Sequence, residues 1–177
     1  MHRRAVLQAG FGAAAWAGIQ GRAWAGAPGL AIADRIEIQD LLARALWATD
    51  TGDAGALAAA MTRDAIVTDV QGRSWSAAAY GARLAGAGRR AGVLHEAQVN
   101  RVRRSGRQVI VESYWSAMAW PQGQPDPGLE DLALCTDTCV KQGGRWRIAS
   151  RRVRAWNSAT VHVGSSGGSA GGSGGPT

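Results

Sequence analysis

The sequence predicts an α+β fold in which helices pack on one face of a curved, mainly antiparallel sheet. Three observations support this prediction. Apolar residues recur every three or four positions in much of the stretch from 34 to 90, they alternate with polar residues after Gly92, and glycine-rich turns divide the later part into long segments. A curved sheet covered on one side by helices forms a cone, whose open mouth suits a small apolar ligand.

The first predicted element is a long amphipathic helix that ends near Asp50. Asp34 and Glu37 fit a capping box, in which side chains bond the free backbone N–H groups at a helix start. The positions that follow at helical spacing are Ile38, Leu41, Leu42, Ala45, Leu46 and Thr49. Gly52 then breaks the helix, and Asp53 is placed to cap a short second helix over residues 54–61.

A strand and a third helix are expected next. A turn at residues 62–64 leads into an apolar strand over residues 65–70, and Gln71 and Gly72 form another turn. Ser76 is placed to cap a helix that runs from Ala77 to about residue 90. Three glycines weaken this helix, since each costs about 1 kcal/mol relative to alanine.

The rest of the folded part reads as a series of long strands. In the first of them, Val93, His95, Ala97 and Val99 share one face. A turn at residues 105–106 precedes a strand over 108–120, and a loop rich in Pro and Gly follows over 121–128. Strands over 129–141 and 145–156 complete the series, joined by a turn at residues 143–144, and no internal repeat is present.

The N-terminal segment predicts a cleaved export signal over residues 1–25. Arg3 and Arg4 precede a moderately apolar stretch rich in Ala and Gly, which resembles a twin-arginine signal. The sequence Ala-Trp-Ala at 23–25 predicts cleavage before Gly26. The alternative is an amphipathic N-terminal helix. We therefore expect an exported protein, periplasmic or secreted, that has no membrane anchor once the signal is removed.

The other end, residues 164–177, contains almost only Gly and Ser and predicts a flexible tail, which leaves one folded domain over about 30–163. Cys135 and Cys139 are the only cysteines. On one extended strand they would lie about 13 Å apart, which is too far for a disulfide. They are expected to be small apolar residues on one sheet face, and no second Cys/His pair suggests a metal site.

The charge of the chain does not point clearly to nucleic acid. The formal net charge is +7, and three of the arginines lie in the predicted signal. The densest basic run, residues 145–154, alternates with apolar residues as a strand does, rather than forming a continuous basic arm. Because Trp146 and Trp156 flank this run, binding of RNA or another partner stays open as a remote alternative. We expect no nucleic-acid partner.

Two stretches resemble the SnoaL-like domains of the NTF2-like superfamily. The first, residues 34–65, contains the pattern of an I-x-x-L helix, a D-x-x-D motif, a short helix and a strand entered through D-A. The second, residues 144–156, resembles the last strand of these domains. Together they bracket nearly the whole folded part in the predicted order of elements. The resemblance implies an NTF2-like cone and says much less about activity.

The resemblance also implies a site. Scytalone dehydratase, bile-acid 7α-dehydratase and hexachlorocyclohexane dehydrochlorinase share an Asp at the end of the first helix and a His on the strand after the third, which match Asp50 and His95. An Arg near the end of the last strand of the bile-acid enzyme matches Arg154. The family places a Tyr or Lys five residues before the Asp, where this chain has Ala45.

The chemistry of these residues fits proton transfer. A histidine can move protons near neutral pH, and a carboxylate can orient it and stabilise its charged form. His95 shares its predicted face with Val93, Ala97 and Val99, the face expected to line the cone. The alternative is that His95 is a core histidine satisfied by a backbone carbonyl, with Asp50 a carboxylate at a helix end.

Four further residues are candidates for substrate binding. Arg154 alternates with Trp146, Ile148, Ser150 and Arg152, so we expect it on the inward face, where its guanidinium could bind a carbonyl or carboxylate. It could equally be a surface arginine paired with Asp69 or Asp137. The other candidate wall residues are Ser113, Trp115 and Thr136.

These features predict a cofactor-independent lyase or isomerase of the dehydratase type, with Asp50 and His95 as its acid/base dyad. Its substrate would be a small, largely apolar cyclic, polyketide-like or steroid-like molecule. A binding module of the same fold without catalysis is the alternative, favoured by Ala45. No cofactor motif is recognisable, and a homo-oligomer that pairs through the outer sheet face is expected.

Overall fold

A computed structural model describes residues 29–86, 93–119 and 128–156. The predicted signal, the tail, residues 157–163, the end of the third helix and most of the 121–128 loop lie outside these ranges. The order of elements is α2 (Ile32–Thr51), α3 (Ala54–Ala60), β1 (Met61–Thr68), β2 (Ser74–Ser76), α4 (Ala77–Gly86), β3 (Val93–Ser105), β4 (Gln108–Ala119), β5 (Gly128–Gln142) and β6 (Arg145–Ala155). None of these helices is long and apolar enough to cross a membrane.

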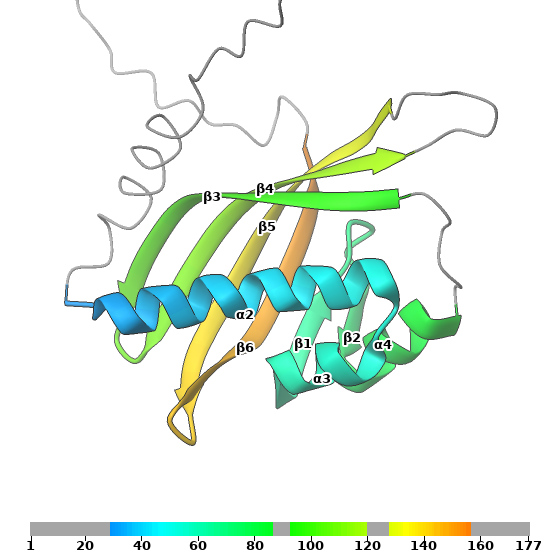
Figure 1. Ribbon diagram of the computed structural model, residues 1–177. Helices are drawn as coiled ribbons and strands as arrows, with labels where there is room; N and C mark the ends of the chain where they lie inside the picture. Colours follow the sequence, from blue (N-terminus) through cyan, green and yellow to red (C-terminus); the bar gives the residue numbers. More distant parts are fainter. Residues whose placement is uncertain (1–28, 87–92, 120–127, 157–177) are drawn as a thin grey trace, which may run out of the picture.

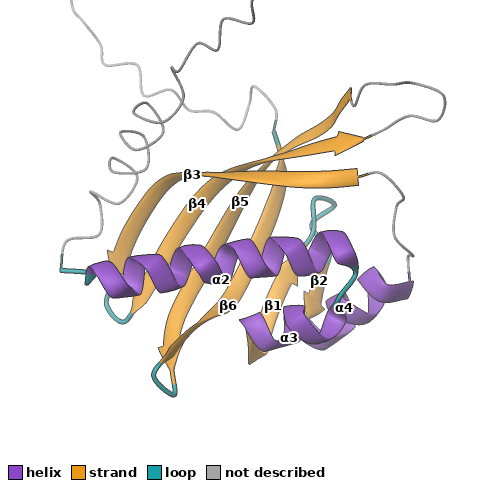
Figure 2. Ribbon diagram, in the orientation of Figure 1, coloured by secondary structure: helices purple, strands orange, loops and turns teal. Residues whose placement is uncertain are grey.

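The predicted α+β cone is confirmed. Six strands form one curved sheet in the order β2-β1-β6-β5-β4-β3, and every neighbouring pair is antiparallel except β1 with β6. The helices all lie on one side of the sheet, with α2 running across β3 to β6 (Figure 1). Helices α3 and α4 lie near β1 and β2, at the other end of the sheet from β3 (Figure 2).

Helix α2 forms because its apolar positions repeat at helical spacing. Ile38, Leu41, Ala45 and Ala48 are buried, and the helix ends at Gly52, whose positive φ of 67° favours glycine. Asp53 accepts a hydrogen bond from the backbone N–H of Ala56 and so caps α3 as expected. These two short-range signals set the path of the chain immediately after Asp50.

The predicted capping box at the start of α2 is wrong. The N-cap is Ala31, and no side chain caps this end of the helix. Instead, Asp34 Oδ1 accepts hydrogen bonds from Lys141 Nζ and from Trp146 Nε1, and Glu37 Oε1 accepts one from the backbone N–H of Trp146. The hydrogen bond from Lys141 is the main reason why the pKa of Asp34 lies below its ordinary value. These contacts fix α2 against the β5–β6 turn.

Other boundaries differ from the prediction in small ways. Residues 62–64 belong to strand β1 rather than to a turn, because the chain enters the sheet directly after α3. Strand β2, which is only three residues long, was not predicted. The strand boundaries elsewhere agree within one or two residues, and the turns at Gly106 and at Gly143 and Gly144 adopt positive φ as glycine allows.

The buried apolar residues form two clusters between the helices and the inner face of the sheet. The larger cluster joins α2, α3 and β1 to the adjoining parts of the long strands and includes Ile38, Leu57 and Ile148. The smaller cluster consists of Trp115, Ala133, Cys135 and Val153, with Leu46 packed against it. Cys135 and Cys139 are free and buried on the same face of β5, as expected for two small apolar residues on one sheet face.

Candidate active site

Asp50 and His95 meet where the end of α2 lies against the first part of β3. His95 Nδ1 is 2.5 Å from Asp50 Oδ1, and the backbone N–H of His95 donates to Asp50 Oδ2 at 3.1 Å. One carboxylate therefore holds both the backbone and the ring of the histidine. This arrangement favours the tautomer with hydrogen on Nδ1 and leaves Nε2 free of any partner among the described residues.

The position of Asp50 is unfavourable unless it is compensated. The last turn of α2 carries no basic residue, and a carboxylate near the negative end of a helix dipole is destabilised by about 0.3–1 kcal/mol. The Asp50 side chain is also only 8% exposed. The two hydrogen bonds from His95 offset this cost, since a buried carboxylate must be paired. A locally unfavourable residue that holds a histidine is typical of a functional site.

His95 faces a cavity of about 270 Å³, which we call the dyad cavity. Trp115 forms one wall, and Tyr80 of α4 forms another part. The centres of the Trp115 and His95 rings are 6.2 Å apart, and the two ring planes are tilted by 57° relative to each other. The remaining residues that line it are Thr49, Asp69, Val70, Leu84, Ala117, Asp131, Ala133 and Val153. Asp50 does not line the cavity, so it acts there only through its hydrogen bonds with His95.

Tyr80 is a polar residue of this cavity that the sequence analysis missed. Burial raises the pKa of its phenol above the ordinary value, so the hydroxyl stays protonated at neutral pH. The phenol is therefore available as a hydrogen-bond donor to a ligand. The helical pattern of residues 77–86 indicated the helix, but the residue spacing alone gave no signal that Tyr80 would line the same cavity as His95.

The structure separates the four predicted substrate-binding residues into two pairs. Ser113 and Trp115 lie on the inner face of β4, and both are buried. Thr136 and Arg154 do not line the cone: Thr136 lies opposite Arg152 and Glu112, and Arg154 lies opposite Leu134, all on the outer face. The expectation that Arg154 faces inward is therefore wrong.

A register shift in β6 explains the error. The pairing with β5 shifts between Ile148 and Ser150, which places an extra residue in β6 and reverses which side chains face inward. Trp146 and Ile148 are buried before the shift, and Arg151 and Val153 are buried after it. Simple alternation from Trp146 therefore assigns Arg154 to the wrong face, and the inward arginine is Arg151.

Arg151 forms a buried ion pair with Asp137 between the two apolar clusters. Its Nε and Nη2 donate to the two carboxylate oxygens at 2.7 and 3.1 Å, and its guanidinium lies 4.9 Å from the centre of the Trp115 ring. Burial alone would lower the pKa of Arg151, but the charge of Asp137 raises it, so the guanidinium stays charged. Cys135 donates weakly to the same carboxylate, and burial holds the pKa of its thiol far above the ordinary value.

Trp115 also separates the dyad cavity from a second cavity of about 280 Å³, which lies between α2 and the sheet. Arg151, Asp137 and Ser113 contribute polar groups to this second cavity. The other residues that line it are Gln39, Leu42, Ala43, Leu46, Ala97, Val99 and Trp115. Two cavities of comparable size therefore share one aromatic wall.

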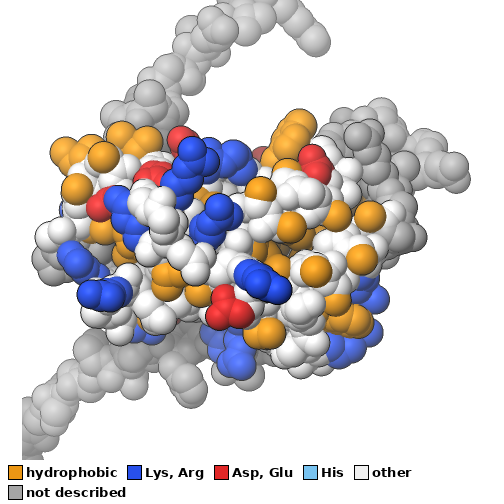
Figure 3. Space-filling view, turned by 90° about the horizontal axis from the view of Figure 1, so that it is seen from below, with side chains coloured by type: hydrophobic (Ala, Val, Ile, Leu, Met, Phe, Trp, Pro, Cys, Tyr) orange, Lys and Arg blue, Asp and Glu red, His pale blue; other side chains and the backbone are white. Residues whose placement is uncertain are grey.

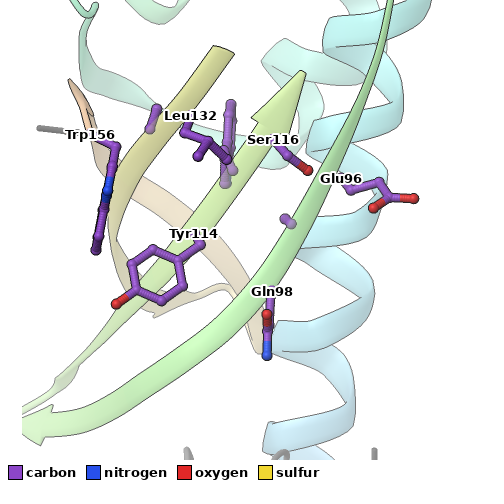
Figure 4. A pocket seen from close by; sticks show the side chains of 9 residues that line it. Glu96, Gln98, Tyr114, Ser116, Leu132 and Trp156 are labelled. Atoms are coloured by element: carbon purple, nitrogen blue, oxygen red, sulfur yellow. The ribbon is translucent and has the colours of Figure 1, made fainter. Parts of the chain in front are cut away.

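A larger concavity lies on the opposite face of the sheet. This outer groove, of about 730 Å³, is lined by side chains that include Tyr114, Leu132 and Trp156. Figure 4 shows them on the side of the sheet turned away from α2, together with Glu96, Gln98 and Ser116. The groove contains no histidine and does not include the Asp50–His95 pair. We therefore place the candidate chemistry in the smaller dyad cavity.

The face that Figure 3 shows carries charged side chains of both signs. Basic side chains are scattered there among acidic and apolar ones, rather than gathered in one continuous stripe. Among the described residues, no three His, Cys, Asp or Glu side chains are grouped so that they could hold a metal ion.

Comparison with solved structures shows which fold this arrangement shares. An NTF2-like protein with a cystatin-like fold from Novosphingobium aromaticivorans superposes with a TM-score of 0.65 at 21% identity, covering 73% of this chain and 86% of that one. A protein described as a candidate scytalone dehydratase from the same organism gives 0.60 at 21% identity, covering 71% and 86%. ActVI-ORFA from Streptomyces coelicolor gives 0.57 at 17% identity, covering 68% and 96%.

These superpositions establish the fold, but at such low sequence identity they do not establish the activity. A search of curated proteins finds no match to this chain. The SnoaL-like domain family, in contrast, matches residues 31–152, a range that includes Asp50, His95 and Arg151. The chain is therefore a member of the SnoaL-like family within the NTF2-like fold.

Proposed function

We propose that this protein is a cofactor-independent lyase or isomerase that removes a proton from carbon in a small, largely apolar cyclic ligand. The contact between Asp50 and His95 beside a cavity carries the proposal. It leaves one ring nitrogen, Nε2, free to accept a proton, while the carboxylate stabilises the imidazolium that forms. The mostly apolar walls of the dyad cavity suit a polyketide-like or steroid-like ring system.

Dehydration is the reaction that this geometry supports best. His95 Nε2 takes a proton from the carbon next to the one that carries a hydroxyl, and the C–H electron pair forms the new C=C bond. The C–O bond breaks, and the leaving oxygen receives the proton back from the imidazolium and departs as water. Tyr80, which stays protonated, can donate a hydrogen bond to the same oxygen. No oxidant or reductant is needed.

A panel of hydroxylated cyclic ketones with two to four fused rings tests the proposal. We expect the mature protein, without any added cofactor, to convert at least one member to the unsaturated ketone, which is followed by its ultraviolet absorbance. Binding of several members without conversion of any would instead support the alternative, a small-molecule-binding module. Ala45, buried where the family has Tyr or Lys, favours that alternative, because one polar anchor is missing.

We also propose that the mature protein pairs with a second copy through its outer sheet face. Tyr114, Leu132 and Trp156 are 37–40% exposed there, on the side of the sheet turned away from α2 (Figure 4). Such apolar groups on one open face favour association. We expect the mass of a dimer in light scattering after size exclusion, and a monomer for Tyr114→Lys. Trp47→Lys, a matched change on the exposed side of α2, should leave the dimer intact. A wild-type monomer at high concentration would contradict the proposal.

Export by the twin-arginine route is the third part of the proposal. The paired arginines precede an apolar segment and an Ala-Trp-Ala site, as in such signals. We expect exported protein to begin at Gly26, and replacement of Arg3 and Arg4 by Lys to block export without preventing folding. N-terminal sequencing and cell fractionation measure the two effects. Normal export of the double Lys variant would indicate the general secretory route instead.

A further inference from the structure

The basic run of β6 is divided among three environments, and one of them is a cleft outside the cone. Arg151 is buried inside the cone, and Arg154 lies on the outer face of the sheet. Arg145 and Arg147, at the start of the strand, instead line a cleft of about 390 Å³. This cleft shares no lining residue with the dyad cavity or with the second cavity.

The cleft, which we call the basal cleft, lies between α2, α3 and the first residues of β6, next to the β5–β6 turn (Figure 1). The residues that line it are Glu37, Leu41, Arg44, Ala56, Ala59, Ala60, Arg145, Trp146 and Arg147. Three guanidinium groups therefore share the cleft with a single carboxylate. Arg44 and Arg145 are exposed and Arg147 is half-buried, so all three can reach a ligand from solvent.

The arginines of the basal cleft keep most of their hydrogen-bonding capacity. Arg147 donates to a backbone carbonyl in the last turn of α3, which holds its side chain at the wall of the cleft. Neither Arg44 nor Arg145 has a hydrogen-bond or ion-pair partner among the described residues. Glu37 already accepts a hydrogen bond from the backbone N–H of Trp146. Because like charges that converge repel one another, an anion bound among these arginines would be stabilised.

The arrangement of the donors favours a tetrahedral anion. Arg44 approaches from α2, whereas Arg145 and Arg147 approach from β6, so a bound group meets donors from two elements. A carboxylate presents two oxygens in one plane. A phosphate group presents oxygens in several directions, carries about −1.5 to −2 charge at neutral pH, and matches the fork of a guanidinium. Three positive charges against one negative charge can balance such a group.

We propose that the basal cleft binds a phosphate group, either free or carried by a small ligand, with Arg44, Arg145 and Arg147 as its hydrogen-bond donors. The cleft contains neither Asp50 nor His95, so this site does not depend on the chemistry proposed for the dyad. The negative charge of Glu37 opposes the bound anion, which gives the proposal a test of opposite sign.

Calorimetric titration of the mature protein tests the proposal. The probes are inorganic phosphate, glycerol 3-phosphate and succinate, at low ionic strength, where exposed charges are screened least. We expect saturable binding of at least one phosphate probe, at least about fivefold tighter than that of succinate. Tighter binding of glycerol 3-phosphate would support an esterified phosphate as the ligand, and tighter binding of inorganic phosphate would support the free ion. No saturable binding, or equal binding of succinate, would overturn the proposal.

Matched variants locate the binding. Arg44→Gln and Arg145→Gln should each weaken binding of the better phosphate probe by at least about fivefold, because each removes a charged donor. Arg154→Gln, which removes the same charge from the outer face of the same strand, should change it by less than about twofold. Glu37→Gln should tighten binding, since its amide oxygen can still accept from Trp146. Equal weakening in Arg145→Gln and Arg154→Gln would overturn the proposal, because it would show an effect of net charge alone. Weaker binding in Glu37→Gln would also overturn it.

Discussion

Replacement of His95 by Gln is expected to lower turnover of any substrate of this protein by at least about 10²-fold. Glutamine keeps a similar length and can form hydrogen bonds, but it has no nitrogen that accepts a proton at neutral pH. Binding should change little, because Trp115 and the apolar walls of the dyad cavity remain. The measurement is kcat and KM for a converted hydroxylated ketone, and the effect should appear in kcat.

Asp50→Asn provides the matched test of the supporting carboxylate. The amide oxygen can still accept one hydrogen bond from His95, so the contact in which Nδ1 and the backbone N–H share two oxygens is only partly lost. The amide cannot stabilise the imidazolium, and kcat should fall while the fold survives. A wild-type kcat in either variant would show that the dyad does not perform the chemistry.

The largest expected effect on stability comes from breaking the ion pair inside the cone. Arg151→Met leaves the carboxylate of Asp137 buried, 2% exposed, without its partner. Removal of one member of a buried pair costs about 3–5 kcal/mol, so the free energy of unfolding should fall by about that amount. Urea denaturation followed by circular dichroism measures it.

Arg154→Met is the control for this prediction, because it makes the same change three residues later on the same strand. Arg154 is exposed on the outer face, so its replacement should alter the free energy of unfolding by less than about 0.5 kcal/mol. The double variant Asp137→Leu with Arg151→Met should recover most of the lost stability. Equal effects of the two single arginine variants would contradict the assignment of faces after the register shift in β6.

The parts of the fold that follow from local pattern could be predicted from the sequence. The burial of Ile38, Leu41 and Ala45 follows from spacing alone, and glycine at position 52 marks the end of α2 because its φ is positive. The alternation in β3 places His95 inward by the same reasoning. Each of these features depends on residues close together in the chain.

The features that depend on distant parts of the chain could not be predicted in this way. Asp34 and Glu37 fit a local capping box, but Lys141 and Trp146 compete for the same oxygens once the fold brings them together. The register shift in β6 leaves no mark in the sequence, so alternation assigned Arg154 to the inner face that Arg151 occupies. The pairing of Arg151 with Asp137 depends on the register between β5 and β6, which the sequence does not reveal.

The central claim, that His95 removes a proton from carbon in a bound ligand, is tested most directly by hydrogen exchange. The panel of hydroxylated cyclic ketones is incubated in D₂O with the mature protein, and deuterium at carbon is followed by proton NMR. We predict that at least one ketone exchanges faster than in buffer alone, and that His95→Gln reduces this rate by at least about 10²-fold. Exchange at the buffer rate for every ketone, or an equal rate with His95→Gln, would contradict the claim.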